Sequence, residues 1–172
     1  MADLARDRPS RAAERARSED AGKSEYLAFR VGHSVFAVPV AIVREIVRTS
    51  HITSVPRAPH AVLGITSFRG RIVTVLDLGL RLGEGSSANT PERGAKLGDS
   101  ARGRMRTLMV DVAGETIGLT VDEVLVVHRF SSREIERASQ AVGADVAEHV
   151  VGIARPTEGE VVQLLDAKAL TP

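Results

Sequence analysis

Short apolar runs separated by turn residues dominate the chain after its first 24 residues. The run 26–38, YLAFRVGHSVFAV, is rich in β-branched and aromatic residues and is interrupted by a Gly-His-Ser turn, which predicts a hairpin. Because Pro39 has no amide hydrogen, we expect it to end the second strand or to lie at a sheet edge. The segment 40–50, VAIVREIVRTS, then predicts a short amphipathic turn or an irregular edge strand.

A second hairpin is predicted over residues 60–82, HAVLGITSFRGRIVTVLDLGLRL. Gly70 follows Arg69 between two apolar runs, and a glycine at that point allows the tight reversal that a hairpin needs. The run after the turn is short and rich in β-branched residues, which indicates a buried strand rather than a helix. Asp77 closes this run and predicts an N-cap for a short helical turn that extends to Leu82. We therefore expect Arg69 to stand at the tip of the hairpin.

The second half of the chain repeats the first. Residues 26–38 and 107–119 each hold two β-rich runs around a turn, and residues 62–82 match 150–170 with a single insertion. The matched residues are Gly64-Ile65 with Gly152-Ile153, Gly70 with Gly159, and Leu76-Asp77 with Leu165-Asp166. A matching order of such residues is much harder to obtain by chance than a matching composition, so two copies of one unit are predicted. Two copies of four or five short strands imply two small β-barrels packed together.

The copies differ at the tip of the second hairpin, where Arg69 is matched by Glu158. A turn residue with a purely structural role should be alike in both copies, so an arginine in only one of them points to recognition. Asp77 and Asp166, in contrast, stand at equivalent positions, which favours helix capping over a pair of catalytic carboxylates.

Three segments lack the strand pattern. Residues 1–24 mix arginines with acidic residues around a single large apolar side chain, which predicts a disordered tail. Residues 84–103 are rich in Gly, Ser and Ala and predict a flexible loop between the copies. Residues 131–150 are the most helix-like part of the chain, with the Ser131-Ser132 pair as the source of an N-cap, although an internal glycine argues against a continuous helix.

The folded part is predicted as one domain over residues 25–170. It would consist of two barrel subdomains, about 25–83 and 104–170, with terminal strands that can be exchanged between them. The chain has 172 residues and 43% hydrophobic content, which is enough to bury the core that this arrangement needs.

Composition narrows the classes of function. The chain has no cysteine, which excludes a disulfide framework and a thiolate metal site and fits a reducing compartment. Its net charge is +1 and only 3% of its residues are aromatic, so neither the basic face nor the stacking side chains of a nucleic-acid-binding protein are evident. No apolar segment is long enough for a signal peptide or a membrane span. These features predict a cytoplasmic protein whose contact with a membrane would come through a partner.

No catalytic or metal-binding pattern emerges from the sequence. The five histidines are scattered without the close paired spacing of a metal site. The motifs of serine hydrolases, P-loop proteins and dinucleotide-binding proteins do not occur. We therefore predict no cofactor, no metal and no enzymatic activity. The alternatives are a small-barrel nucleic-acid-binding protein, which the near-neutral charge disfavours, and an enzyme, which the lack of a convergent polar cluster disfavours.

Several motifs resemble, in order, those of the CheW-type chemotaxis coupling proteins. They are YLAFRVGHSVFAVPVAIVREI, VPRAP, GITSFRGRIVTVLDL, IGLTVDEV and LLDAKAL, and together they span about residues 25–170. The resemblance implies a mainly β fold of two SH3-like five-stranded barrels with short helices, and no catalysis. It also implies two partners, the cytoplasmic tip of a methyl-accepting chemoreceptor and the regulatory domain of a CheA-type histidine kinase. Such proteins couple these partners in arrays at the inner membrane or in the cytoplasm.

The resemblance and the chemistry of the motifs together predict a set of partner-binding residues. They are Val43, Glu45, Ile46, Gly64, Arg69 and Gly70. Val43 and Ile46 would offer apolar area to a receptor helix. Glu45 and Arg69 would supply oriented charge that fixes the register of a complex more than its affinity. Which of these residues faces the receptor and which faces the kinase stays open.

The chain departs from the family pattern at two points. The usual Asn-Leu-Arg-Gly reads Ser67-Phe68-Arg69-Gly70 here, and a proline common in the following strand is Thr74. Because the arginine and the glycine are kept, the interface prediction stands, and a specialised pair of receptor and kinase is expected. A pathway that governs surface motility or development fits the sequence as well as flagellar control does.

Overall fold

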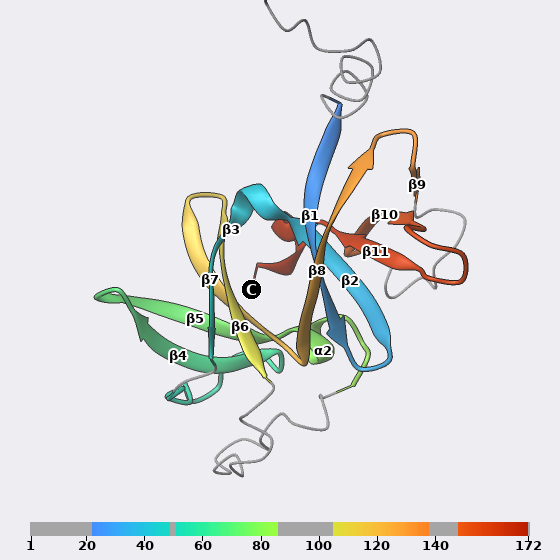
Figure 1. Ribbon diagram of the computed structural model, residues 1–172. Helices are drawn as coiled ribbons and strands as arrows, with labels where there is room; N and C mark the ends of the chain where they lie inside the picture. Colours follow the sequence, from blue (N-terminus) through green and yellow to red (C-terminus); the bar gives the residue numbers. More distant parts are fainter. Residues whose placement is uncertain (1–21, 49–50, 86–104, 138–147, 172) are drawn as a thin grey trace, which may run out of the picture.

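The computed structural model describes residues 22–48, 51–85, 105–137 and 148–171 (Figure 1). In the first half of the chain the elements are β1 (Lys23–Val31), β2 (Ser34–Pro39), the 3-10 helix η1 (Val40–Ile42), β3 (Val43–Arg48), β4 (Val62–Phe68), β5 (Arg71–Asp77) and the helix α2 (Leu78–Arg81). In the second half they are β6 (Arg106–Val112), β7 (Glu115–Val121), β8 (Glu123–Ser131), β9 (Ile135–Arg137), β10 (Val150–Ala154), β11 (Val162–Leu165) and the 3-10 helix η3 (Ala167–Leu170). The prediction of a mainly β fold with short helices is confirmed.

The strands form two mixed sheets, and each sheet takes strands from both halves of the chain (Figure 1). The larger sheet has the order β8-β1-β2-β11-β10-β9, and the five-stranded sheet has the order β3-β6-β7-β5-β4. A parallel pair joins the halves in each sheet, β11 with β2 and β5 with β7. In addition, β8 pairs with β1 and β3 pairs with β6, so each half extends the first hairpin of the other half.

The two sheets are built with the same register. Leu27 faces Val127 across β1 and β8, and Leu108 faces Ile46 across β6 and β3. The repeat aligns Leu27 with Leu108 and Ile46 with Val127, so the two ladders are equivalent residue for residue. Each ladder also has a register shift shortly beyond this pair. The repeat in the sequence is therefore a repeat of strand pairing.

The hairpins β4–β5 and β10–β11 are equivalent in the same way. Gly64 faces Val75 and Gly152 faces Leu164, and a register shift precedes the glycine in both hairpins. The insertion in the second copy falls in the connection between β10 and β11. There the ladder ends at the pair Ala154–Val162, whereas the β4–β5 ladder continues to the pair Phe68–Arg71.

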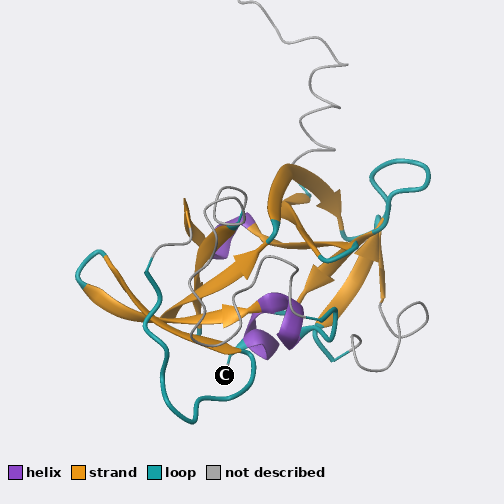
Figure 2. Cartoon of the chain, turned by 90° about the horizontal axis from the view of Figure 1, so that it is seen from below, coloured by secondary structure: helices purple, strands orange, loops and turns teal. Residues whose placement is uncertain are grey.

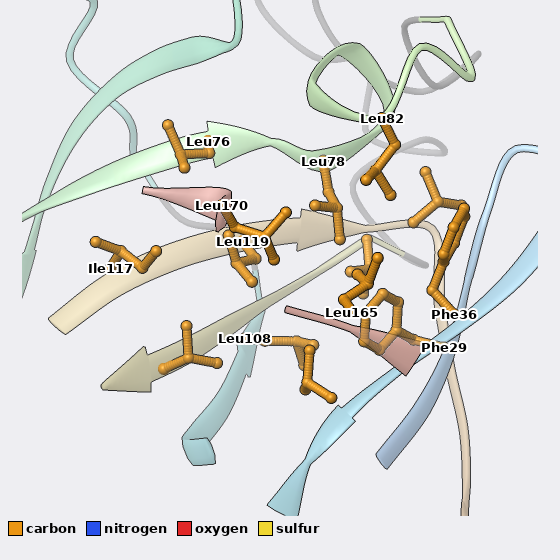
Figure 3. Packing of buried hydrophobic residues seen from close by; sticks show 14 of the residues in the cluster. Phe29, Phe36, Leu76, Leu78, Leu82, Leu108, Ile117, Leu119, Leu165 and Leu170 are labelled. Atoms are coloured by element: carbon orange, nitrogen blue, oxygen red, sulfur yellow. The ribbon is translucent and has the colours of Figure 1, made fainter. Parts of the chain in front are cut away.

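The main hydrophobic core takes side chains from both sheets (Figure 3). Its fully buried members include Phe29, Phe36, Leu76, Leu78, Leu108, Leu119 and Leu170. A smaller cluster around Phe130 contains Ala28, whereas its neighbours Leu27 and Phe29 belong to the main core. Residues of β1 thus alternate between the two clusters, as the side-chain direction of a strand requires. Because each half of the chain contributes to the main core, burial of apolar surface holds the halves together.

Each copy ends in a short helix that is capped by an aspartate, as predicted. Asp77 Oδ1 accepts a hydrogen bond from the Leu80 amide at 3.1 Å, and Asp166 Oδ1 accepts one from the Lys168 amide at 2.9 Å. The two helices lie side by side (Figure 2), and Arg81 Nη2 of α2 donates to two backbone carbonyls of the η3 segment at 2.9 and 3.1 Å. The capping interpretation of both aspartates is confirmed.

The helix-like segment 131–150 requires a correction. Glu134 Oε2 accepts hydrogen bonds from the Ser131 amide at 2.8 Å and the Ser131 hydroxyl at 2.6 Å, but the chain continues into strand β9 instead of a helix. Strand β9 pairs with β10 at Gly152, which allows a close approach of the two backbones. Sheet pairing therefore overrides the local helix preference. Residues 138–147 lie outside the described part of the chain.

The predicted tail and loop fall mostly outside the described residues. Strand β1 begins inside the tail predicted for residues 1–24, because Lys23 pairs with Ser131. Glu84, at the start of the loop predicted for 84–103, accepts a hydrogen bond from Ser34 Oγ at 2.8 Å. The segments outside the description are 1–21 and 86–104. The division into two subdomains, about 25–83 and 104–170, stays a prediction.

Candidate partner-binding surface

Arg69 lies in the turn of the β4–β5 hairpin, as predicted, because β4 ends at Phe68 and β5 begins at Arg71. The φ angles of Arg69 and Gly70 are 49° and 78°. Positive φ at both central residues is the geometry of a two-residue type I′ turn, whose twist matches that of the strands it joins. A Cβ at Gly70 would meet nothing within 4 Å, so this glycine is required by backbone conformation and not by packing.

Arg69 forms an ion pair with Glu45, which brings together two of the predicted partner-binding residues. Arg69 Nη2 and Nε lie 2.6 and 3.0 Å from Glu45 Oε2. The guanidinium carbon also lies 5.5 Å from the centre of the Phe68 ring, within the range of a cation–π contact. The Arg69 side chain is 76% exposed and that of Glu45 37%, and an exposed ion pair adds only about 0–1 kcal/mol to stability. The pair therefore orients the guanidinium more than it stabilises the fold.

The ion pair connects the two edges of the five-stranded sheet. Glu45 belongs to β3 at one edge, and Arg69 follows β4 at the other. Ile46 follows Glu45 along β3, so its side chain points to the opposite face of the strand, and it is 42% exposed. Val43 is half-buried and packs against the main core. Edge strands carry backbone groups that are free to pair with another chain. The edge of β3 therefore combines apolar area, an oriented charge and an open strand.

Gly64 lies apart from this surface. It is buried in β4, with a φ of 150°, and a Cβ there would lie 2.2 Å from the carbonyl oxygen of Thr53. Thr53 and Ile65 exchange two backbone hydrogen bonds of 2.8 and 2.9 Å, so the segment around Thr53 pairs antiparallel with β4 next to the glycine. In the second copy, a Cβ at Gly152 would likewise lie 2.8 Å from the carbonyl oxygen of Glu136. The structure gives Gly64 a packing role, and its part in partner binding stays a prediction.

Beside the hairpin tip lies a cleft that sequence reasoning missed. It encloses about 370 Å³ and is lined by Arg44, Phe68, Arg69, Arg71, Val73 and Thr116. The Thr116 hydroxyl donates to Asp111 Oδ1 at 2.7 Å, and Arg44 Nε donates to Asp111 Oδ2. These two contacts, with a smaller contribution from the charge of Arg71, hold the pKa of Asp111 below its ordinary value of 3.8. The rim of the cleft therefore carries an ionised carboxylate among arginines at neutral pH.

One signal in the sequence could have located this cleft. Asp111 and Thr116 flank the turn at Ala113-Gly114 and face each other across β6 and β7. A polar pair opposite one another next to a hairpin turn is predictable from the strand alternation. The approach of Arg44 and Arg71 from two other strands is not predictable from the sequence, because it depends on the order of strands in the sheet.

Neither a metal centre nor a membrane-spanning helix occurs in the described ranges. No group of three or more His, Cys, Asp or Glu side chains in residues 22–48, 51–85, 105–137 and 148–171 could hold a metal ion. In the same ranges, every helix is too short or too polar to cross a membrane.

Comparison with known proteins assigns this fold to a family. The family model described as the CheW-like domain matches residues 25–172, so the chain belongs to the CheW-like domain family. Protein FrzA of Myxococcus xanthus is 32% identical over 151 residues, which cover 86% of this chain and 85% of that protein. Chemotaxis protein CheW of Rhizobium meliloti is 28% identical over 151 residues, which cover 88% and 89%. The crystal structure of the scaffolding protein TtCheW from Thermoanaerobacter tengcongensis matches with a TM-score of 0.70 at 26% identity, over 84% of this chain and 85% of that one.

Family membership confirms the resemblance seen in the motifs. The solved CheW structure also supports the architecture of two small β units. Scaffolding proteins of the CheW-like family are non-catalytic, so the chain falls in a class of proteins that act by binding.

Proposed function

We propose that this protein is a non-catalytic scaffold that couples chemoreceptors to a CheA-type histidine kinase in a chemosensory array. Membership of the CheW-like family and similarity to chemotaxis proteins support the proposal. The observation that carries it is the Glu45–Arg69 ion pair on the edge strand β3, which also carries the exposed Ile46. This surface has the features of a docking site and lacks those of a reaction site.

Both apolar contact and charge would contribute to binding at this surface. Ile46 offers exposed apolar area to an amphipathic helix such as that of a receptor tip. The ion pair with Glu45 favours one orientation of Arg69, which reduces the conformational entropy lost when a partner engages it. The ion pair would set the register and the rate of association more than the final affinity.

The partners define where the protein acts. They are the cytoplasmic tip of a methyl-accepting chemoreceptor and the regulatory domain of a CheA-type kinase. The protein would work in the cytoplasm, recruited to receptor arrays at the inner membrane or in the cytoplasm. Coupling requires no chemical step, because simultaneous binding of both partners is sufficient to hold them in one assembly.

The test compares Arg69 with Arg155, an arginine of the second hairpin that also forms an exposed ion pair but is not its equivalent in the repeat. Arg69 follows β4 and pairs with Glu45, and Arg155 follows β10 and pairs with Glu136. Calorimetric titration should measure binding of the full chain to the kinase regulatory domain and to the receptor tip from the same organism. We expect Arg69→Ala to weaken binding to one of them about tenfold or more, and Arg155→Ala to have little effect. Both variants should unfold near the wild-type temperature, because each loses only an exposed ion pair.

Two results would contradict the proposal. One is a folded wild-type chain that binds neither the kinase domain nor the receptor tip. The other is an Arg69→Ala variant that binds both partners as the wild type does. A double-mutant cycle with Glu45→Ala sharpens the second result, because a coupling energy in binding should appear only if the pair acts as a unit.

A further inference from the structure

We infer that the cleft beside the β4–β5 tip binds one acidic side chain of a partner protein. The inference deepens the proposed function and rests on it, because it specifies the chemistry of a partner at the same end of the five-stranded sheet. The cleft is the space of about 370 Å³ between β3, the start of β7 and the β4–β5 hairpin. Such a volume accommodates a single side chain with its neighbouring residues.

The charges at the cleft leave one cation in excess. Arg44 pairs with Asp111, and Arg69 pairs with Glu45. Arg71 lines the same cleft and makes no ion pair with any residue in the described ranges, although its charge helps to lower the pKa of Asp111. Three guanidinium groups thus stand against two carboxylates. One further carboxylate would balance them.

The guanidinium groups retain donors for that carboxylate. Arg44 uses Nε toward Asp111, and Arg69 uses Nε and Nη2 toward Glu45. Each guanidinium has five N–H donors in a planar fork that matches a carboxylate, so both arginines can donate further. Phe68 and the buried Val73 form the apolar part of the lining. An acidic side chain with an adjacent apolar residue is therefore the ligand that fits both the charge and the walls.

The second copy shows that the fold does not require this basic lining. The repeat aligns Arg69 with Glu158 and Arg71 with Glu160, so both arginines of the tip are replaced by acids. Glu160 Oε2 accepts a hydrogen bond from Thr157 Oγ1 at 3.1 Å, which keeps its carboxylate within its own turn. Glu160 is thus engaged within its own turn, and we take the occupant of the cleft to be an acidic side chain of a different protein.

A direct test uses two blocked tripeptides, acetyl-Leu-Glu-Leu-amide and acetyl-Leu-Gln-Leu-amide, which differ only in the carboxylate. The arginine Nε–H signals of the full chain are followed by NMR during titration. We expect the Glu peptide to shift the signals of Arg71 and Arg44, and the Gln peptide to leave them in place. Arg71→Glu should abolish the response. Arg133→Glu, an equal change of charge at an exposed turn residue near the other sheet, should preserve it.

Three outcomes of this experiment would overturn the inference. The first is an equal response to the two peptides, and the second is a response that survives Arg71→Glu. The third is a stronger response to inorganic phosphate than to the Glu peptide, which would identify a site for a free anion. The peptide readout needs neither receptor nor kinase, so the inference and the proposed function can fail separately.

The affinity of the same variants should also be measured for the partner protein that the wild-type chain binds. Arg71→Glu should weaken that complex at least about tenfold and reduce its salt dependence, and Arg71→Lys should weaken it less, because lysine keeps the charge but not the planar fork. Unchanged affinity in Arg71→Glu would overturn the inference. Self-association of the isolated chain would also overturn the inference if Arg71→Glu abolishes it and the added change Glu158→Arg restores it. In that case the occupant of the cleft would be a second copy of this chain.

Discussion

The hairpins β4–β5 and β10–β11 share one backbone design and carry opposite charges. Both have a register shift before a buried glycine, and both lead into an aspartate-capped helix. At the turn, however, Arg69 and Arg71 of the first hairpin stand where the second has Glu158 and Glu160. The fold therefore constrains the positions that pack or cap and leaves the tip free to carry either sign of charge. Recognition chemistry is carried by tip side chains that neither pack into the core nor cap a helix.

The edge strands β3 and β8 likewise share a position in the fold but differ in their side chains. They occupy equivalent edges of the two sheets, and the repeat aligns Glu45 and Ile46 with Val126 and Val127. Val126 and Val127 are 51% and 45% exposed, so the second edge presents two apolar side chains where the first presents an acid and an isoleucine. A valine cannot hold an arginine at the neighbouring hairpin. The two ends of the molecule are thus specialised for different contacts.

The largest expected effect tests the equivalence of the two buried glycines. Gly64→Ala places a Cβ 2.2 Å from a backbone oxygen in a conformation that only glycine adopts readily, so we expect a loss of about 3 kcal/mol in the free energy of unfolding. In Gly152→Ala the Cβ would lie 2.5 Å from the movable Cγ2 of Ile135 and 2.8 Å from the backbone oxygen of Glu136. Because Gly152 has no positive φ, the loss should be smaller, about 1–2 kcal/mol. Urea denaturation of the full chain measures both. Equal losses would show that the two glycines tolerate a side chain equally poorly, contrary to the difference in their surroundings.

A medium effect should separate the two helix caps. Asp77 is 1% exposed, whereas Asp166 is only half-buried, so Asp77→Ala should cost about 2 kcal/mol and Asp166→Ala about 1 kcal/mol or less. Denaturation midpoints provide the measurement. Asp166→Asn serves as a control, because asparagine keeps the capping oxygen and should restore most of the stability. A larger loss at Asp166 than at Asp77 would contradict the argument that burial sets the cost of losing a cap.

The smallest effect concerns the pKa of Asp111. The repeat aligns Thr116 with Val35, so Thr116→Val makes the second copy resemble the first and removes the hydrogen bond that contributes most to lowering this pKa. We expect the pKa of Asp111 to rise toward 3.8 when followed by NMR. Because a lowered pKa gives stability that is present above 3.8 and is lost as the pH falls through the folded value, the variant should lose less stability in acid.

Glu134 provides the internal control for that titration. Its pKa is lowered by the hydroxyl and amide of Ser131, on the other sheet. Thr116→Val should leave the pKa of Glu134 unchanged. A parallel rise in both groups would show that the substitution disturbs the whole fold and not one hydrogen bond.

The candidate site was predictable where a single residue broke the repeat. Arg69 stood out because a residue with a purely structural role would have been matched in the second copy, and the structure places it in the turn, paired with Glu45. The cleft beside it was not predictable, because Arg44, Arg71 and Thr116 belong to three strands that lie far apart in the sequence. The need for glycine at position 64 was not predictable either. A side chain there would clash with the backbone of Thr53, and this contact between separate segments leaves no local pattern in the sequence.

The sequence by itself determined the strand class, the turn at Gly70, the two aspartate caps and the repeat, because each depends on residues that are neighbours in the chain. Only the tertiary structure decided which strands pair. Each half contributes to both sheets, and β9 forms a strand where local propensity favoured a helix. Pairing across the halves buries one shared core, and this gain in burial arises from contacts between distant segments. The charged cleft is a product of the same pairing, so it exists only in the folded molecule.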